Sequence, residues 1–441
     1  MSSASNRTFS DLGLSKWLVD ALTSMAIRKP SNIQSACIPK ILAGHDCIGG
    51  ARTGSGKTIA FAAPILEKLS RDPYGICALI LSPTRELSLQ IAEQISALGT
   101  SMGIKHAIVV GGMDIISQAL ALQNRPHIVI ATPGRLADLI RSSPEIVEGF
   151  RRLHYLVLDE ADRLLTPGFA DDLDECTSIL PPADKRQTLL FTATITPAVT
   201  QLKDRPDVSN RLPVFMHAGP SASSIAIPAT LSQKYLFIPS HVREAYLYTI
   251  LTISENEKKS AIVFVNRTRT AEVLRQTLRL MEVRVTALHS EIPQRERTDS
   301  LGRFRAEAAR VLIATDVASR GLDIPTVELV INFDIPADPD DYIHRVGRTA
   351  RARRQGESIS IVTENDVERI QAIEERVGKK MEIYDAVTET KVIAESLQQV
   401  SNARREALMN MEKEKFGEKR NARKKRALLE AGGGGHRKSR R

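Results

Sequence analysis

Two short segments restrict the fold of this sequence more than any other feature. The first, Ala51–Thr58, is a glycine-rich loop that ends in Lys57-Thr58, and the second is the acidic pair Asp159-Glu160, which follows the apolar run Tyr155–Leu158. Glycines allow backbone N–H groups to close around phosphates, and a lysine at the end of such a loop can reach the outer phosphates. Both segments fit at the carboxyl ends of parallel strands, so together they predict an α/β fold with a nucleoside triphosphate site.

Four residues of this site have expected roles. Lys57 would bind the outer phosphates of ATP, while Thr58 and Asp159 would offer a hydroxyl and a carboxylate to Mg²⁺. Glu160 is then free to orient the attacking water. A glycine turn or a solvated acidic loop would explain either segment alone, but both in this order indicate a nucleotide site. Ala51 stands where the general loop pattern has glycine.

The remaining pattern indicates two domains. The 441 residues, 42% of them apolar, are too many for one ordinary core. Short β-branched runs alternate with helix-like stretches, which is typical of parallel sheets covered by helices on both faces. Prolines and small residues indicate a linker at 206–230. We therefore expect a flexible segment at 1–8, α/β domains at 9–205 and 231–385, and a basic helical or disordered extension at 386–441. The expected strands are Cys77–Leu81, His106–Val110, His127–Ile130, Tyr155–Leu158, Thr188–Phe191, Lys234–Ile238, Ala261–Val265, Arg284–Leu288, Arg310–Ile313, Glu328–Ile331 and Ser358–Val362.

The net charge is concentrated at the C-terminal end of the sequence. Lys413–Arg441 contains twelve Lys/Arg and three Asp/Glu, which accounts for the whole formal charge of +9. A tail of this kind attracts polyanions, and it can also serve as a nuclear localisation signal. No apolar run approaches the roughly 18–20 residues of a membrane span, so we expect no membrane partner. The four cysteines show no metal spacing, which favours buried thiols in a reducing compartment, the cytosol or nucleus.

Further motifs, in a fixed order, make residues 9–380 resemble the DEAD-box RNA helicases. Pro30–Gln34, with Phe9 upstream, resembles the Q motif that reads adenine, and Thr192-Ala193-Thr194 resembles the motif that couples hydrolysis to RNA binding. The segments that resemble RNA-contacting motifs are Pro83–Leu87, Gly111-Gly112, Thr132–Arg135, Val263–Asn266, Gln294–Arg297 and Ala314–Asp316. The segments that resemble the second domain's part of the ATP site are Ser319–Asp323 and His344–Arg351.

This resemblance implies two tandem RecA-like domains that share one ATP site. The second domain would supply Asp323 near the ribose and Arg345 and Arg348 as arginine fingers. The first would bind ATP through Phe9, Ile27, Gln34, Arg52, Thr53, Gly54, Ser55, Gly56, Lys57 and Thr58. RNA would be contacted by Thr84, Arg85, Gly111, Gly112, Thr132, Arg135, Arg297 and Thr315, with Thr192 and Thr194 as coupling residues. Such contacts address the RNA backbone and ribose, so they carry little sequence information.

The sequence departs from the family's pattern at a few positions. The Q motif of the family usually opens with glycine and an aromatic residue, whereas this chain has Ala26-Ile27. Ile27 keeps an apolar face but cannot stack, so we expect weaker adenine binding. Ala350 replaces a glycine, which is harmless unless the backbone there requires a positive φ. Thr192 replaces the usual serine, and Ser319 replaces a frequent alanine.

The resemblance implies an RNA-dependent ATPase that unwinds short RNA duplexes or remodels RNA–protein complexes. The alternatives are a translocase of a related helicase group, which the Q motif disfavours, and a non-catalytic RNA clamp or scaffold, which the intact phosphate-chemistry residues disfavour. The basic extension is similar to that of nucleolar ribosome-biogenesis members of the family. It implies pre-rRNA or small nucleolar RNA as a partner, an activating protein cofactor, and a monomer working within a pre-ribosomal assembly in the nucleus and nucleolus. A helicase of mRNA metabolism or translation is the alternative.

Overall fold

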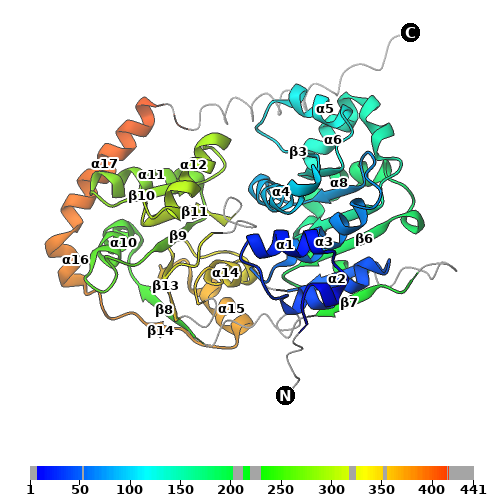
Figure 1. Ribbon diagram of the computed structural model, residues 1–441. Helices are drawn as coiled ribbons and strands as arrows, with labels where there is room; N and C mark the ends of the chain where they lie inside the picture. The colour runs from blue at the N-terminus through cyan, green and yellow to red at the C-terminus, as the bar shows by residue number, and fades with distance from the viewer. Residues whose placement is uncertain are drawn as a thin grey trace, which may run out of the picture. The chain divides into compact units, whose positions relative to one another are not determined.

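The structure, a computed structural model, describes residues 7–51, 54–201, 212–218, 230–316, 324–350, 355–414 and 416. Arg52, Thr53 and Asp323 lie outside the described residues, as do most of the expected linker and of the basic tail. The described chain forms two compact units, unit 1 up to residue 218 and unit 2 from residue 230 (Figure 1). Among these residues no helix combines the length and the apolar character that crossing a lipid bilayer demands.

Unit 1 is built on a parallel sheet. Its described residues contain seven strands in the order β3-β4-β2-β5-β6-β1-β7. The strands are β1 (Cys47–Gly50), β2 (Ala78–Leu81), β3 (His106–Val109), β4 (Ile128–Ala131), β5 (Tyr155–Asp159), β6 (Gln187–Thr192) and β7 (Phe215–Ala218). The helices are α1 (Lys16–Ser24), α2 (Asn32–Leu42), α3 (Lys57–Leu69), α4 (Arg85–Gly99), α5 (Ile115–Gln123), α6 (Pro133–Ser142), α7 (Ala161–Leu164), α8 (Ala170–Ser178) and α9 (Pro197–Thr200).

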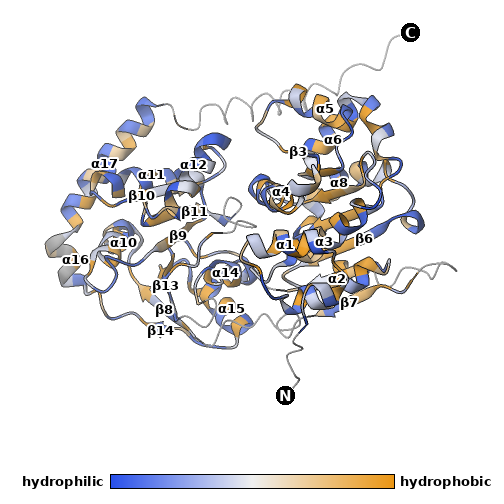
Figure 2. Ribbon diagram, in the orientation of Figure 1, coloured by the Kyte–Doolittle hydropathy of each residue, from blue (hydrophilic) through white to orange (hydrophobic). Residues whose placement is uncertain are grey.

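Both faces of this sheet are covered, which explains why its strands read as continuous apolar runs. Successive side chains of a strand point to opposite faces. Ile80 and Val157 belong to the core packed against α1–α4, whereas their neighbours Leu79 and Leu156 belong to the core packed against α6 and α8. Figure 2 shows both apolar and polar residues on the helices that surround the sheet, as expected of helices with one face against a core. The parallel arrangement places all strand carboxyl ends, and therefore β1 and β5 with their polar loops, at one edge.

Unit 2 repeats this plan. Across its described residues seven parallel strands run in the order β10-β11-β9-β12-β13-β8-β14. They are β8 (Leu231–Phe237), β9 (Ala261–Val265), β10 (Val285–Leu288), β11 (Val311–Thr315), β12 (Leu329–Asn332), β13 (Gly356–Val362) and β14 (Glu382–Ile383). The helices are α10 (Arg243–Thr252), α11 (Thr268–Leu280), α12 (Gln294–Arg305), α14 (Pro339–Val346), α15 (Val367–Val377), α16 (Glu389–Glu395) and α17 (Leu397–Lys413). In both units short 3₁₀ turns supplement these helices: five in unit 1, at Ser10–Leu12, Thr100–Met102, Pro144–Phe150, Pro167–Phe169 and Ala183–Lys185, and one in unit 2, at Ser240–Val242, among the described residues.

Every expected strand is present within a few residues of its expected bounds, and the expectation of two α/β units with parallel sheets is confirmed. Three strands were not expected. β1 contains a pair of glycines, and a Cβ on Gly49 would lie 2.6 Å from the Phe191 ring, so packing excludes the larger residues typical of strands. β7 lies inside the expected linker but pairs with β1, so the linker does not extend over Phe215–Ala218. β14 has only two residues.

The start of the C-terminal extension is part of unit 2. Val400, Ala403, Ala407 and Met411 form the buried stripe of α17, which packs along α11. Arg404 donates to Glu244 at 2.9 Å, so the helix is also tied to α10. In Figure 1 this helix lies beside α11 and α16. The expected boundary at residue 385 therefore does not mark the end of the folded unit; the described chain continues as packed helix to Lys413.

Candidate nucleotide site and RNA-contacting edge

The glycine-rich loop connects the end of β1 to the start of α3. Gly54 and Gly56 have φ values of +79° and +86°, in the left-handed region that favours glycine. A Cβ on Gly56 would also lie 2.2 Å from the Gln34 amide nitrogen, so no other residue fits there. Lys57, the first residue of α3, donates from Nζ to the Ala51 carbonyl at 2.9 Å. The lysine is therefore held across the loop, at the helix N-terminus where phosphate binds favourably.

The acidic pair lies at the end of β5. Asp159 is the last residue of the strand and is only 3% exposed. Its Oδ1 accepts a hydrogen bond from the Glu160 backbone N–H at 3.1 Å, and Glu160 adopts a left-handed φ of +53°. Burial raises the pKa of Asp159 to about 7, although the Lys57 charge opposes the rise. A nearby cation would stabilise the charged form of such a buried carboxylate.

We expect a pH-dependent effect of Asp159→Asn on the stability of the nucleotide-free protein. The pKa of Asp159 lies above its ordinary value of 3.8, so the folded chain holds an extra proton between about pH 4 and pH 7. The contribution of this group to the free energy of unfolding therefore falls as pH rises through that interval. Asparagine should raise the melting temperature at pH 8 and change it little at pH 5. Thermal unfolding at both pH values checks this, with the exposed Asp174→Asn as control; an equal shift at the two pH values would contradict it.

Gln34 links the Q motif to the phosphate loop. It lies on α2, is 3% exposed, and accepts a hydrogen bond from Ser31 N–H at 2.8 Å through Oε1. Its Nε2 donates to the Gly56 carbonyl at 3.1 Å. The amide is thus oriented by two backbone groups, and its remaining N–H and oxygen lone pair are available to an adenine edge. Phe9 is buried in the core of unit 1 and Ile27 packs at its border, so their contact with adenine stays a prediction.

The acidic segment and the coupling motif are joined by hydrogen bonds. Thr192 ends β6 and donates from its hydroxyl to the Thr194 carbonyl at 2.6 Å. The backbone N–H of Thr194 donates to Asp162 Oδ2 at 3.1 Å, and its hydroxyl donates to the same oxygen. Asp162 had no role assigned from the sequence, although it belongs to the same four-residue acidic segment as Asp159. A displacement of either segment would therefore move the other.

The expected RNA contacts of unit 1 lie together at one edge of its sheet. Thr84 is the N-cap of α4, and Arg85 begins that helix. The Arg85 guanidinium lies against the turn after β3. It is so close that a Cβ added to Gly111 or Gly112 would be only 2.6 or 2.4 Å from its nitrogens. Arg135 in α6, which Thr132 caps, donates to the Met113 carbonyl of the same turn at 3.0 Å.

Two guanidinium groups and two helix N-termini thus surround one glycine turn. Burial lowers the pKa of Arg85, and the charge of Arg135 adds to this effect while Glu86 opposes it. The two guanidinium groups are therefore close enough for the charge of one to affect the other. Guanidinium groups and helix N-termini are the groups that proteins use for phosphates of a nucleic acid backbone.

The expected site residues of unit 2 lie at the end of β11, in α12 and around the end of α14. Thr315 ends β11, and Arg297 lies in α12; both are buried. Arg345 lies in the last turn of α14 and is 1% exposed, and Arg348 follows just after the helix and is 4% exposed. The role of the two arginines as fingers stays a prediction.

Two alanines at positions where the family has glycine adopt left-handed backbone conformations. Ala26 has a φ of +61° and Ala350 a φ of +56°. Because φ is positive at Ala350, the replacement of glycine by alanine there costs stability. An L-residue in this region costs roughly 1–2 kcal/mol, from which the lower chain entropy of unfolded alanine recovers about 0.4–1 kcal/mol.

We therefore expect Ala350→Gly to raise the free energy of unfolding by about 0.5–1 kcal/mol, because it removes the left-handed alanine. Urea unfolding of the two proteins measures the difference. The matched control is Ala21→Gly inside α1, which should lower the free energy of unfolding by about 1 kcal/mol. A loss of stability in both variants would contradict the prediction.

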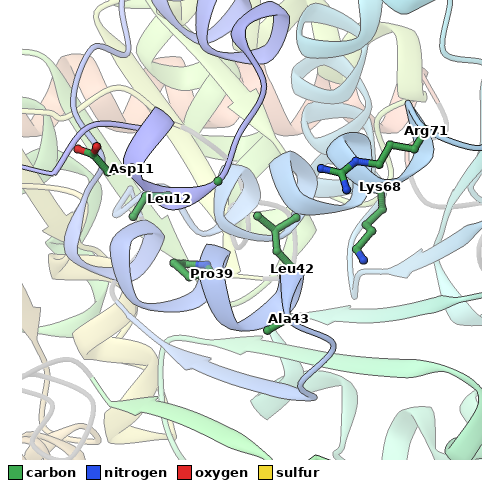
Figure 3. Close-up of a pocket in the computed structure, with 8 residues that line it drawn as sticks. Asp11, Leu12, Pro39, Leu42, Ala43, Lys68 and Arg71 are labelled. Atoms are coloured by element: carbon green, nitrogen blue, oxygen red, sulfur yellow. The ribbon is translucent and has the colours of Figure 1, made fainter.

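Unit 1 also has a pocket of about 380 Å³, and none of the expected site residues lines it (Figure 3). Asp11, Leu12, Pro39, Leu42, Lys68 and Arg71 line it. Arg71 pairs with Glu67 at 3.3 Å, and the buried Glu67 also accepts hydrogen bonds from the backbone and hydroxyl of Ser15. The carboxylate thus anchors the start of α1 to the end of α3.

Comparison with known proteins agrees with this geometry. The DEAD/DEAH box helicase family matches residues 31–202, and the helicase conserved C-terminal domain matches residues 243–353. The ATP-dependent RNA helicase DBP8 of Scheffersomyces stipitis is 62% identical over 424 residues, which cover 96% of this chain and 95% of that protein. The dbp8 helicase of Schizosaccharomyces pombe is 60% identical over 433 residues, 98% of this chain and 95% of its own length.

Solved structures extend the similarity to the fold. S. cerevisiae Dbp5 bound to RNA and ADP BeF3 has a TM-score of 0.73 at 29% identity, covering 90% of this chain and 99% of that chain. Mss116p bound to ssRNA and AMP-PNP has a TM-score of 0.78 at 29% identity, covering 91% of this chain and 84% of that chain. Motif order, parallel sheets and similarity over nearly the full length lead to one conclusion: the chain belongs to the DEAD-box family of ATP-dependent RNA helicases.

Proposed function

We propose that this RNA helicase unwinds short RNA duplexes, or remodels RNA–protein complexes, during pre-rRNA processing and assembly of the small ribosomal subunit. The observation that carries the proposal is the placement of the charge. The whole formal net charge of +9 lies in Lys413–Arg441, a segment that begins at the last residue of α17, the helix packed on unit 2. Such a segment attracts polyanions, and its run Arg423–Arg426 can direct a protein to the nucleus and nucleolus.

The residues of unit 1 fit ATP and a divalent cation. The Ser55 hydroxyl is buried without a hydrogen-bond partner among the described residues, as expected of a group that faces a ligand. Thr58 and the buried Asp159 would hold Mg²⁺, which when bound would neutralise charge on the phosphates. No cluster of three or more His, Cys, Asp or Glu side chains in the described parts of the chain could hold a metal unaided. The nucleotide phosphates would supply the remaining ligands.

Hydrolysis would then depend on positioning and charge. Lys57 would bind the outer phosphates, Glu160 would orient the attacking water, and Arg348 of unit 2 would stabilise charge in the transition state. An arginine finger is worth roughly 10³–10⁵ in rate in comparable systems. RNA that binds both units would favour the state in which this arginine acts, so RNA and ATP would strengthen each other's binding.

The RNA partner would be held by its backbone. The turn at Gly111-Gly112, with Arg85 and Arg135 around it, offers guanidinium donors suited to phosphates. Selection of a pre-rRNA or small nucleolar RNA duplex would then come from the basic tail or from an activating protein. We propose that the chain acts as a monomer within the pre-ribosomal assembly.

Crosslinking of the full chain to RNA in living cells tests the cellular role. Enrichment of small-subunit pre-rRNA or of small nucleolar RNA is the expected result, and depletion of the protein should lead to accumulation of unprocessed small-subunit precursors. Enrichment of mature mRNA, with normal pre-rRNA after depletion, would refute the proposal and favour a role in mRNA metabolism or translation.

We expect the tail to add to RNA affinity. Residues 417–441 contain ten Lys/Arg and two Asp/Glu. Removing them should weaken RNA binding and flatten its salt dependence, since each phosphate contact adds roughly 0.7 to the slope of log affinity against log salt for single strands. Four lost contacts would change the slope by about three. Hydrolysis at saturating RNA should barely change.

RNA titrations at several salt concentrations with the full chain and with residues 1–416 measure these slopes. This end point keeps α17 and the described Phe416 in place. A full-length variant with Arg423–Arg426 changed to alanine separates charge from length. Identical slopes for all three proteins would show that the tail is a localisation or protein-docking segment.

A further inference from the structure

The side chain of Gln118 in α5 is bonded to the backbone just before the turn at Gly111-Gly112. Its Oε1 accepts a hydrogen bond from the Val110 N–H at 3.0 Å, and its Nε2 donates to the Val110 carbonyl at 3.1 Å. Gln118 is 5% exposed, and Val110 is fully buried. Buried backbone groups need hydrogen-bond partners. One amide therefore satisfies both polar backbone groups of the residue that connects β3 to the turn.

This glutamine also anchors α5, which packs against the edge strand β3. Of the nine residues of the helix, all of them described, Gln118 and Leu122 are buried, whereas Ile115, Ile116 and Leu120 are exposed. Most of the large apolar side chains of α5 therefore contribute little burial to its attachment. The position of the helix against β3 thus depends strongly on the paired amide.

The other end of the turn is held by an arginine. Arg135 Nη1 donates to the Met113 carbonyl at 3.0 Å, while the Arg85 guanidinium lies against both glycines. Gln118 therefore fixes the start of the turn, and Arg135 fixes its end. The two arginines are the groups expected to contact RNA phosphates. Gln118 is buried, so it can affect RNA only through the backbone that it holds.

We propose that Gln118 is a positioning residue, which holds the turn at Gly111-Gly112 in the conformation that binds RNA. A pair of glycines allows many backbone conformations, so the rest of the protein has to impose one of them. A binding surface that is fixed before contact loses less conformational freedom on binding than a mobile one. The inference rests on the RNA contact proposed for this turn and for Arg85, and it is independent of the cellular role.

Gln118→Met in the full chain tests this role. Methionine is similar to glutamine in length, and it removes both hydrogen bonds to Val110. We expect the RNA concentration for half-maximal stimulation of ATP hydrolysis to rise about tenfold, because two bonds that order the turn are lost. The turnover number at saturating RNA should stay within about twofold of the wild-type value, since loss of binding alone changes half-saturation and not turnover. Affinity for ATP without RNA should not change.

Two control variants of the same helix separate positioning from stability. Gln123→Met removes an exposed amide, which donates to Glu145 at 3.0 Å, and wild-type kinetics are expected. Leu122→Ala removes the other buried side chain of α5, which is apolar and makes no hydrogen bond to the turn. It should lower the melting temperature, because it leaves a cavity, but keep the half-saturating RNA concentration near the wild-type value. All kinetics are measured well below the melting temperature of every variant.

Three results would overturn the proposal. A wild-type half-saturating RNA concentration in Gln118→Met would show that the amide does not position the turn. An equal rise in Leu122→Ala would show that any loosening of α5 has the same effect. Lower turnover at saturating RNA, with unchanged half-saturation, would place Gln118 in the chemical step and not in RNA binding. If Gln118→Met does not fold, Gln118→Asn decides by the same criteria, because its shorter amide stays polar but cannot span both groups of Val110.

Arg85→Ala distinguishes failure of this inference from failure of the proposed RNA contact. It removes a guanidinium at the turn and should raise the half-saturating RNA concentration. If Arg85→Ala has this effect and Gln118→Met has none, only the role of Gln118 is refuted. If Arg85→Ala has no effect, the RNA contact proposed for the turn fails, and the positioning role of Gln118 fails with it.

Discussion

Glu160→Gln should leave ATP binding intact and lower the rate of hydrolysis by roughly 10²–10⁴-fold, the usual contribution of a positioned base. The physical reason is the division of work within the acidic pair. The Glu160 backbone N–H, not its side chain, donates to Asp159 at 3.1 Å, so the substitution leaves Asp159 in place while it removes the carboxylate that would orient water. Glutamine is nearly isosteric and can keep the left-handed backbone of this position.

Single-turnover hydrolysis with saturating RNA measures the chemical step, and binding of a fluorescent ATP analogue measures affinity. Glu93→Gln, an exposed glutamate of α4, is the control and should hydrolyse ATP at the wild-type rate. A wild-type rate in Glu160→Gln would show that Glu160 does not orient the attacking water and that another group acts as the base.

Arg348→Ala should lower RNA-stimulated hydrolysis by roughly 10³-fold or more, in line with arginine fingers elsewhere. Affinity for ATP without RNA should stay close to the wild-type value, because the phosphate loop and Gln34 belong to unit 1. The backbone of Arg348 donates to the Arg345 carbonyl at 3.1 Å and accepts from Val327 N–H at 3.1 Å, and these bonds survive the substitution.

Turnover and the Michaelis constant for ATP at saturating RNA distinguish the possible roles. A group that acts only in the transition state lowers turnover, whereas loss of a ground-state contact raises the Michaelis constant alone. The second pattern would contradict the arginine-finger assignment. Arg376→Ala, an arginine of α15 in an exposed ion pair, provides the control and should not change either constant.

Much of the fold could be predicted because its strands carry their signal locally. Strands such as β2, β5, β9 and β11 are short apolar runs buried on both faces, and such runs stand out between helical segments. The strands that escaped prediction lack this signal. Gly49 in β1 is required by the Phe191 ring, a contact between residues far apart in the sequence. β7 follows a proline-containing stretch, and β14 is too short to show alternation.

Likewise, the local geometry of the phosphate loop could be predicted because the residues of that loop are adjacent in the sequence. The left-handed φ values of Gly54 and Gly56 and the placement of Lys57 at a helix start are local consequences of one loop. The sequence also identified Ala350 as a departure from the family, but only the backbone φ of +56° showed that it is strained.

The sequence by itself determined the residue types at the strand ends and therefore the reaction class. Only the tertiary structure showed which groups bind the Arg345 side chain. Its partners Asn266, Asp316 and Asp334 are 79, 29 and 11 residues away along the chain, so no local pattern reveals them. The order β11-β9-β12 brings them together. An arginine in a motif is suited to a phosphate or to a buried carboxylate, and the sheet order places the Asp316 carboxylate within hydrogen-bonding distance of Arg345.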